Sequence, residues 1–188
     1  MMKNKRRLSE TVQVLVVTEP NQGIMFENMM AEWRGMPYAQ LSVVLVHLKF
    51  LSALHQNHHW TCKGDPFYGD HLLFSRLYDA VQDEVDTVAE KSIGLGCTSN
   101  VDLHIINSQV LKLIDGVGSG ATIPQSSDLA RKSLMAELNF LKVIDSCIDS
   151  LEECGMLTNG VDNLLQGLAD KHEGHVYLLK QRCSSAMT

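Results

Sequence analysis

Apolar residues recur at helical spacing in four long stretches, and this pattern limits the folds open to the chain more than any other feature. The stretches run from Pro37 to about Trp60, from Phe67 to Leu95, from Asp128 to Cys154, and from Asn159 or Gly160 to about Arg182. Steps of three and four residues bring apolar side chains to one face of an α-helix. The positions are Leu41, Val44, Leu48, Leu51 and His55; Leu73, Leu77, Val81, Val85 and Val88; Leu134, Leu138, Leu141, Val143, Ile144, Ile148 and Leu151; and Val161, Leu164, Leu165, Leu168, Val176 and Leu179. The sequence therefore predicts four amphipathic helices.

The segments between these stretches indicate which helices are neighbours. Residues 63–66 make a short turn between the first two helices, and Gly155 ends the third helix shortly before the fourth begins. Short turns make sequential helices antiparallel neighbours. The insert between the second and third helices is longer and carries its own helical pattern from Asp102 to Ile114, followed by a glycine-rich loop. We therefore expect an all-α, ferritin-like four-helix bundle with a short crossover helix between helices two and three.

Local signals mark the expected ends of the helices and the parts of the chain. Pro37 suits the first position of a helix, because its φ is fixed and its missing N–H is not needed there. Gly94 and Gly96 are expected to end the second helix, and Ser126 and Ser127 to cap the third. Residues 24–33 also have helical spacing. We expect an N-terminal extension with a basic tip over residues 1–36, the bundle over 37–182 and a tail over 183–188.

The composition excludes several classes of protein. Of the 188 residues, 45% are hydrophobic and 20% charged, as in ordinary soluble domains, and no apolar run approaches the ~20 residues of a membrane-spanning helix. The five cysteines are scattered without a C-x-x-C pair, so neither a disulfide framework nor a cysteine zinc site is expected. The formal net charge of -6 argues against nucleic-acid binding by the whole surface. We expect a cytoplasmic chain without membrane contact, in which only a local patch could bind DNA.

Acidic residues line one face of the second helix. Asp79, Asp83, Asp86 and Glu90 follow one another at steps of four, three and four. A solvated outer face explains such a row without any function, and we favour that interpretation for Asp79 and Asp83. Carboxylates four residues apart destabilise a helix by a few tenths of a kcal/mol, so a bound cation is an alternative explanation for Asp86 and Glu90.

Histidines gather near the turn between the first two helices. His55 and His59 lie one helical turn apart, His58 lies beside them, and His71 lies near the start of the second helix. A structural role accounts for any one of them, and is expected for His55. Together, and beside an acidic face, imidazole and carboxylate groups suit iron, zinc or manganese.

A second histidine group, near the end of the chain, has a different expectation. His172, Glu173 and His175 stand in the order H-E-G-H, which is not the H-E-x-x-H motif of metal-binding helices. We therefore expect these three residues on a solvated helix face rather than at a metal ion.

The length of the second helix decides how the first group could combine. His71 and Asp86 are fifteen residues apart, about 22 Å along a helix, so one chain cannot bring both to one ion. The turn does allow His59 to approach His71. A two-fold axis could set these two histidines of one subunit against Asp86 and Glu90 of its mate. The residues alone predict either two unrelated features or a metal site shared between subunits.

The same residues form a pattern that resembles a known family, the Dps mini-ferritins. That family carries H-W-x3-G-x2-F-x3-H and, fifteen residues later, D-x2-A-E. The matching residues here are His59, Trp60, Gly64, Phe67 and His71, and then Asp86, Ala89 and Glu90. The resemblance is close over residues 54–96 and looser over 37–182. One departure is Gly96-Cys97, where the family has Gly-Gly.

The resemblance implies a function as well as a fold. It implies a ferroxidase that oxidises Fe(II) with hydrogen peroxide or dioxygen and stores ferric mineral inside a hollow homo-oligomer, a dodecamer in that family. His59 and His71 would come from one subunit, and Asp86 and Glu90 from its two-fold partner. Trp60 would lie beside the iron, where the ring quenches radicals; a core aromatic is the alternative explanation.

The basic tip leaves a further interpretation open. Lys3, Lys5, Arg6 and Arg7 resemble the lysine-bearing tails with which some Dps proteins bind DNA, although such a tip is also explained as a solubilising end. One alternative function is therefore a DNA-compacting, nucleoid-associated stress-protection protein with secondary iron chemistry. Another is a structural helical oligomer that retains a vestigial site.

Overall fold

The computed structural model describes residues 28–117 and 126–184 of the chain. The basic tip, residues 24–27 of the helical pattern expected over 24–33, the loop over 118–125 and residues 185–188 lie outside the described residues. The described residues contain no strand. Their helices are α2 (Ala39–Thr61), α3 (Phe67–Gly94), the 3-10 helix η1 (Thr98–Val101), α4 (Leu103–Val117), α5 (Ser126–Glu153) and α6 (Asn159–Ser184), and residues 28–32 form a further helical segment.

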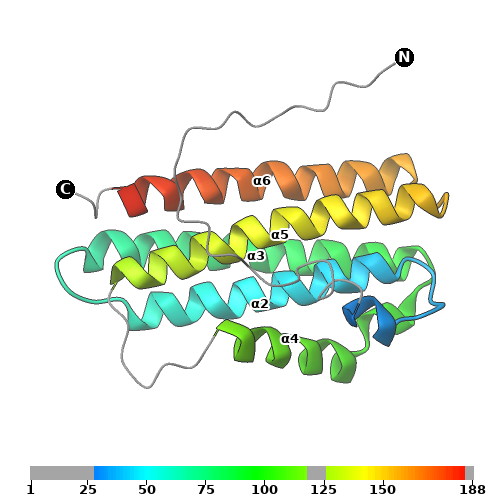
Figure 1. Cartoon of the computed structure of the whole chain (residues 1–188), viewed down its shortest axis with the longest axis horizontal. Helices are drawn as coiled ribbons and strands as arrows, with labels where there is room; N and C mark the ends of the chain where they lie inside the picture. Colours follow the sequence, from blue (N-terminus) through cyan, green and yellow to red (C-terminus); the bar gives the residue numbers. More distant parts are fainter. Residues whose placement is uncertain (1–27, 118–125, 185–188) are drawn as a thin grey trace, which may run out of the picture.

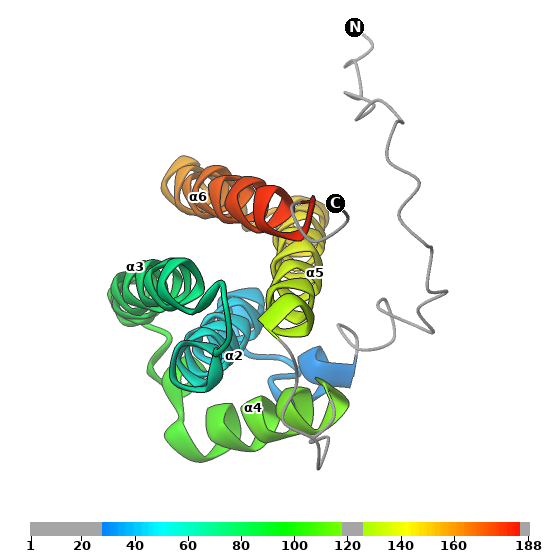
Figure 2. The ribbon, with the colours of Figure 1, turned by 90° about the vertical axis from the view of Figure 1, so that its left-hand side faces the viewer.

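The four long helices form an antiparallel bundle, as the turn lengths predict. α2 packs along α3 and α5 packs along α6, while α2 and α5 form the main contact between the two hairpins (Figure 1). The end-on view in Figure 2 shows α2, α3, α5 and α6 around a common centre, with α4 outside them against α2. The described part of the chain therefore has the all-α four-helix architecture with a crossover helix that its sequence predicts.

Burial on one face of each helix holds the bundle together. Leu41, Leu48 and Leu51 of α2 are almost fully buried, and Phe140 and Ile144 of α5 are fully buried. Met29 and Trp33, which precede α2, belong to the same core cluster. Burial of a large apolar side chain contributes about 1.5–3 kcal/mol, so each helix gains most of its stability from this packing. A smaller apolar cluster at the other end of the bundle includes Phe74, Leu77, Leu129 and Leu179.

The start of α2 differs from the sequence prediction. Pro37 is not the first helical residue; α2 begins at Ala39, and Tyr38 takes a left-handed backbone with φ 54°. The side-chain amide of Asn100 in η1 donates to the carbonyl oxygens of Pro37 (2.9 Å) and Tyr38 (3.0 Å). A tertiary contact therefore fixes this corner and overrides the local preference of proline.

The other predicted helix ends are close to the observed ones. Gly96 and Gly155 have φ values of 80° and 70°, and follow the ends of α3 and α5. A left-handed residue after a helix is a common stop signal, and glycine adopts it without steric cost. Asp102 lies just before α4, where its carboxylate accepts the Ile105 N–H at 2.9 Å. α5 begins at Ser126, slightly earlier than expected.

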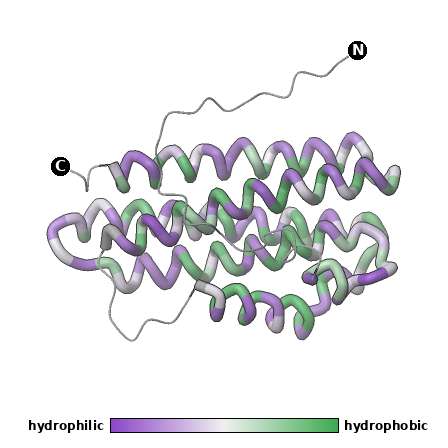
Figure 3. The backbone as a smooth tube through the Cα atoms, viewed as in Figure 1, coloured by the Kyte–Doolittle hydropathy of each residue, from purple (hydrophilic) through white to green (hydrophobic). Residues whose placement is uncertain are grey.

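Polar and apolar residues alternate along the bundle helices. Figure 3 shows both kinds along α3, α5 and α6, as expected for helices with one face in a core and one in solvent. Within the described residues, no helix combines the length and the apolar character that crossing a membrane requires.

Candidate functional site

His59 and His71 meet at the turn between α2 and α3, as the sequence predicts. Their rings stack with centroids 3.8 Å apart. Nδ1 of His59 lies 2.9 Å from the carbonyl oxygen of His71, and Nδ1 of His71 lies 3.1 Å from the carbonyl oxygen of His59. Phe67 stacks on His71 and Tyr78 packs edge-on against His59. The two imidazoles are therefore held in place from both sides.

These reciprocal hydrogen bonds fix the tautomer of both rings. A carbonyl oxygen can only accept, so each Nδ1 must carry the proton and donate it. A neutral imidazole then has its lone pair on Nε2, which is the atom that binds a metal ion. Both side chains are partly buried rather than fully enclosed. The pair thus presents two metal-binding nitrogen atoms from a fixed scaffold.

Three large apolar side chains close in sequence to this histidine pair are exposed. Trp60 is 67% exposed and Tyr68 is 74% exposed, and Leu72 on the following turn of α3 is 51% exposed. Trp60 is therefore not a core aromatic of the single chain, which was one of its two interpretations. Exposed aromatic and aliphatic side chains grouped together are typical of a surface that contacts another protein.

Asp86 and Glu90 lie far along α3 from the histidine pair. Both are exposed on the face that they share with Asp79 and Asp83. His71 and Asp86 belong to one continuous helix, Phe67–Gly94, so their positions along it are about 22 Å apart. The structure brings His59 and His71 together and does not bring them to Asp86 and Glu90 within one chain.

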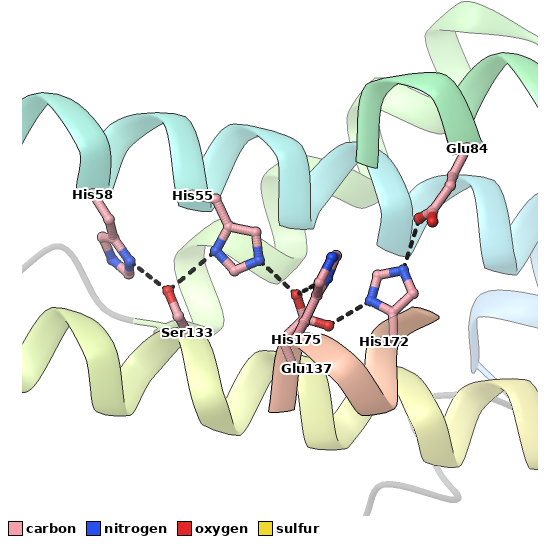
Figure 4. Close-up of polar contacts among 7 residues, drawn as sticks. All are labelled: His55, His58, Glu84, Ser133, Glu137, His172 and His175. Carbon is pink, nitrogen blue, oxygen red and sulfur yellow. Dashed lines mark hydrogen bonds and ion pairs between the residues drawn. The ribbon is translucent and has the colours of Figure 1, made fainter. Parts of the chain in front are cut away.

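A different group of polar side chains converges at the centre of the bundle (Figure 4). Its members come from all four long helices: His55 and His58 from α2, Glu84 from α3, Ser133 and Glu137 from α5, and His172 and His175 from α6. Each is buried. Hydrogen bonds link them into one chain that we call the buried histidine network.

Glu137 is the centre of this network. Its Oε1 lies 2.8 Å from Nε2 of His55 and 3.3 Å from Nδ1 of His175, and its Oε2 lies 2.5 Å from Nδ1 of His172. On the other side of the His172 imidazole, Nε2 lies 2.8 Å from Oε2 of Glu84. An ionised carboxylate only accepts, so all three imidazoles donate to Glu137.

Ser133 extends the network toward the end of α2. Its hydroxyl oxygen lies 3.1 Å from Nδ1 of His55 and 2.8 Å from Nδ1 of His58. The Ser133 hydroxyl has one proton to donate and two lone pairs that accept, so it can bond to both rings at once. Ser133 of α5 therefore links the two histidines of α2.

Electrostatics in the network follow from burial and hydrogen bonding. Burial opposes ionisation of Glu137, but hydrogen bonds from His172, His175 and His55 outweigh it and hold the pKa of this carboxyl well below its usual range. Burial also opposes a charge on His172, yet its hydrogen bonds to Glu137 and Glu84 raise its pKa to about 9. Burial, with charge repulsion from His55 and Lys132, lowers the pKa of His58 to about 3. At neutral pH His172 is therefore charged and His58 is neutral.

This network corrects one prediction and adds residues that were missed. His172 is fully buried and His175 is 7% exposed, so the expectation of a solvated helix face is wrong for both. Glu173 between them is exposed. One atom each from Glu137, His172 and His175 lie within 4.8 Å of one another, a spacing that could hold a metal ion.

The missed carboxylates carry a signal in the sequence. Glu84 stands at apolar spacing between Val81 and Val88, and Glu137 stands three residues before Phe140 and seven before Ile144. A glutamate inside an apolar helix face is buried when the helix packs, and a buried carboxylate needs donors nearby.

Comparisons with known proteins support the fold. No protein-family model matches the chain. A stretch of 56 residues is 38% identical to the nutrient stress-induced DNA-binding protein of Nostoc sp., and this match covers 30% of each of the two chains. The match therefore spans less than a third of that relative's length.

Solved structures match over most of the chain. Dps from Thermosynechococcus elongatus has a TM-score of 0.64 at 17% identity, covering 85% of this chain and 92% of its own. Dps from Listeria monocytogenes has a TM-score of 0.66 at 15% identity, with 79% and 94% covered. Dps from Vibrio cholerae, described as a member of a broad superfamily of ferritin-like diiron-carboxylate proteins, has a TM-score of 0.63 at 14% identity, with 84% and 90% covered. These likenesses confirm the ferritin-like fold, and with it the resemblance to Dps at the level of the fold.

Proposed function

We propose that this chain, which has the fold of the Dps proteins, is an iron-storage protein whose subunits oxidise Fe(II) at sites shared across a two-fold interface. The observation that carries the proposal is the stacked pair of His59 and His71, whose reciprocal hydrogen bonds leave both Nε2 atoms available to iron. Asp86 and Glu90 of a second copy would complete the site. Their exposure on α3 leaves them accessible to such a partner.

The four side chains suit the proposed substrate. Imidazole nitrogen binds Fe(II), and carboxylate oxygen is the harder donor that favours Fe(III). Hydrogen peroxide takes one electron from each of two Fe(II) ions, its O–O bond breaks, and hydrolysis of the two Fe(III) ions gives hydrous ferric oxide and protons. Dioxygen is the alternative oxidant. Trp60, next to His59 in the chain, would lie at the same interface and could give up an electron to a radical formed there.

The apolar surface beside the histidines supports assembly. A patch containing Trp60, Tyr68 and Leu72 would be covered if a second copy docked along this hairpin. Closed assemblies of identical subunits are built from such two-fold contacts. A hollow homo-oligomer, a dodecamer by resemblance to Dps, would then enclose the ferric mineral.

The test replaces the carboxylate half of the site. In a chain carrying Asp86→Ala and Glu90→Ala, the initial rate of ferric absorbance after addition of Fe(II) and peroxide should fall by at least ~10-fold, because two of four ligands are gone. The matched control is Asp149→Ala with Glu153→Ala, an exposed Asp and Glu at the same four-residue spacing on α5. An unchanged rate in the first variant would refute the site. Absent iron oxidation in an intact wild-type assembly would favour the structural oligomer instead.

DNA binding is a second candidate function, favoured by the name of the Nostoc relative, a nutrient stress-induced DNA-binding protein. Lys3, Lys5, Arg6 and Arg7 would supply the contact through phosphate groups. Gel retardation should then weaken steeply with salt and disappear when residues 1–7 are removed. Retardation that persists in the shortened chain would exclude the basic tip as the binding element.

A further inference from the structure

We propose that the buried histidine network contains a second, intra-subunit metal site, in which Glu137, His172 and His175 bind one divalent transition-metal ion of the zinc class. The site lies inside a single bundle, whereas the proposed iron site needs two subunits. One nitrogen or oxygen atom from each of the three residues lies within 4.8 Å of the others.

The present distances are close to those of a coordination sphere. Bonds of about 2.0 Å from a tetrahedral ion put neighbouring ligand atoms about 3.3 Å apart. Nδ1 of His175 is already 3.3 Å from Oε1 of Glu137. Nδ1 of His172 lies 2.5 Å from the other carboxylate oxygen, Oε2, so it would move outward by less than an ångström and release the proton that it now donates when it binds the ion. Side-chain rotations of this size leave the helices in place.

Two residues outside the three ligands hold His172 and Glu137 in position. Oε2 of Glu84 accepts from Nε2 of His172 at 2.8 Å, so the Nδ1 of that ring points at the centre of the site. Nε2 of His55 donates to Oε1 of Glu137 at 2.8 Å. Carboxylates behind metal-binding histidines and hydrogen bonds to metal-binding carboxylates are the usual supports of such sites.

The donor set indicates the class of metal. Two imidazoles and a single carboxylate, all buried, suit zinc and its neighbours, whereas magnesium and calcium prefer oxygen-rich sites. Three protein ligands leave a fourth position open. His175 is the member through which the site reaches the surface, since its side chain is 9% exposed while those of His172 and Glu137 are fully buried.

Cobalt(II) is the probe, because low-coordinate Co(II) absorbs visible light far more strongly than the aqueous ion. The titration uses a chain in which the proposed iron ligands are removed by His59→Ala, His71→Ala, Asp86→Ala and Glu90→Ala. We expect one Co(II) per subunit with this absorption, its displacement by Zn(II), and a higher unfolding temperature with metal than without. A chain that binds no Co(II) in this way would overturn the proposal, and would leave the proposed iron chemistry untouched.

A matched pair of variants locates the ion. Adding His175→Gln, which keeps a polar side chain, should abolish the absorption, whereas His47→Gln, another buried histidine of the bundle, should preserve it. The same pair is made in the otherwise wild-type chain, so that the result does not depend on the four substitutions folding. There, His175→Gln should remove one bound Co(II) per subunit. Undiminished binding in both His175→Gln chains would contradict the assignment.

Discussion

At the scale of single residues, Ser133 joins two buried histidines through one hydroxyl group. Ser133→Ala would leave Nδ1 of both His55 and His58 without its partner in the core. An unsatisfied buried polar group costs about 1–3 kcal/mol, so we expect the free energy of unfolding in urea to fall by about 2 kcal/mol.

The control for this change lies on the same helix. Ser146 donates only to the carbonyl oxygen of Lys142 one turn earlier. Ser146→Ala should leave the free energy of unfolding within about 0.5 kcal/mol of the wild-type value. Equal losses in the two variants would mean that the hydroxyl of Ser133 does not stabilise the network.

His47 makes the stability of the bundle depend on pH. Burial lowers the pKa of His47 to about 4, although its hydrogen bond to the carbonyl oxygen of Val43 opposes this shift. In the unfolded chain the pKa of His47 is near 6.5, so between about pH 6.5 and pH 4 this histidine is protonated in the unfolded state and neutral in the folded state. Stability is therefore complete above about pH 6.5 and is lost as the pH falls toward 4.

The size of this effect is measurable by substitution. Between pH 7 and pH 5 the titration of His47 should remove about 2 kcal/mol of stability. In His47→Leu the drop in the free energy of unfolding between these two pH values should be smaller by that amount. An identical drop in both proteins would show that His47 is protonated in the folded bundle.

The residue patterns show what the sequence can and cannot reveal about sites. The approach of His59 to His71 follows from a short turn and from spacing along two helices. The network around Glu137 does not, because its members are separated by up to 120 residues, from His55 to His175, and meet only when two hairpins pack. His172 and His175 look solvated in a linear pattern because the polar group that satisfies them, Glu137, is on another helix.

At the scale of helices, Arg182 ties the end of α6 to the start of α3. Nε of Arg182 lies 2.5 Å and Nη2 3.0 Å from the two carboxylate oxygens of Asp70, which is buried. Arg182→Met would leave this carboxylate buried without its partner. We expect a loss of about 2 kcal/mol in urea unfolding, below the full cost of breaking a buried pair because the arginine is partly exposed.

The comparison for this change is an arginine without a buried partner. Arg76 is exposed on α3, and Arg76→Met should change the free energy of unfolding by no more than about 0.5 kcal/mol. If Arg182→Met were equally mild, the ion pair would contribute nothing to holding the two helices together.

The helices themselves were largely predictable. Apolar residues at helical spacing, short turns and glycine stops are local signals, and they predicted the four long helices and their antiparallel pairing. The start of α2 was not predictable in the same way, because Asn100 fixes it from a part of the chain more than sixty residues later. Local preference decides a helix end only where no tertiary contact competes with it.

At the scale of the whole molecule, the proposed iron site can be tested by mixing subunits. One variant lacks the histidine half (His59→Ala, His71→Ala) and the other lacks the carboxylate half (Asp86→Ala, Glu90→Ala). A two-fold dimer of one of each contains one intact site and one doubly broken site. Random mixing makes half of the dimers mixed, so about a quarter of the wild-type ferroxidase rate should return after the two inactive proteins are unfolded and refolded together.

The same experiment has an internal control. Each variant refolded alone should stay inactive, and the two proteins mixed without unfolding should also stay inactive if subunits do not exchange. A refolded mixture that has the native mass but no activity would contradict a site shared in this way. The sequence allowed this arrangement to be predicted only as one of two alternatives, since a distance along one helix excludes a single-chain site but does not identify a partner.

The mutual hydrogen bonds of His59 and His71 affect how tightly two copies could associate. Neither ring can rotate without breaking a bond to the other residue's main chain. The conformational entropy of both side chains is therefore lost when the chain folds, before any partner or ion arrives. Docking and metal capture would then not have to order these ligands, and more of the contact energy would remain as affinity.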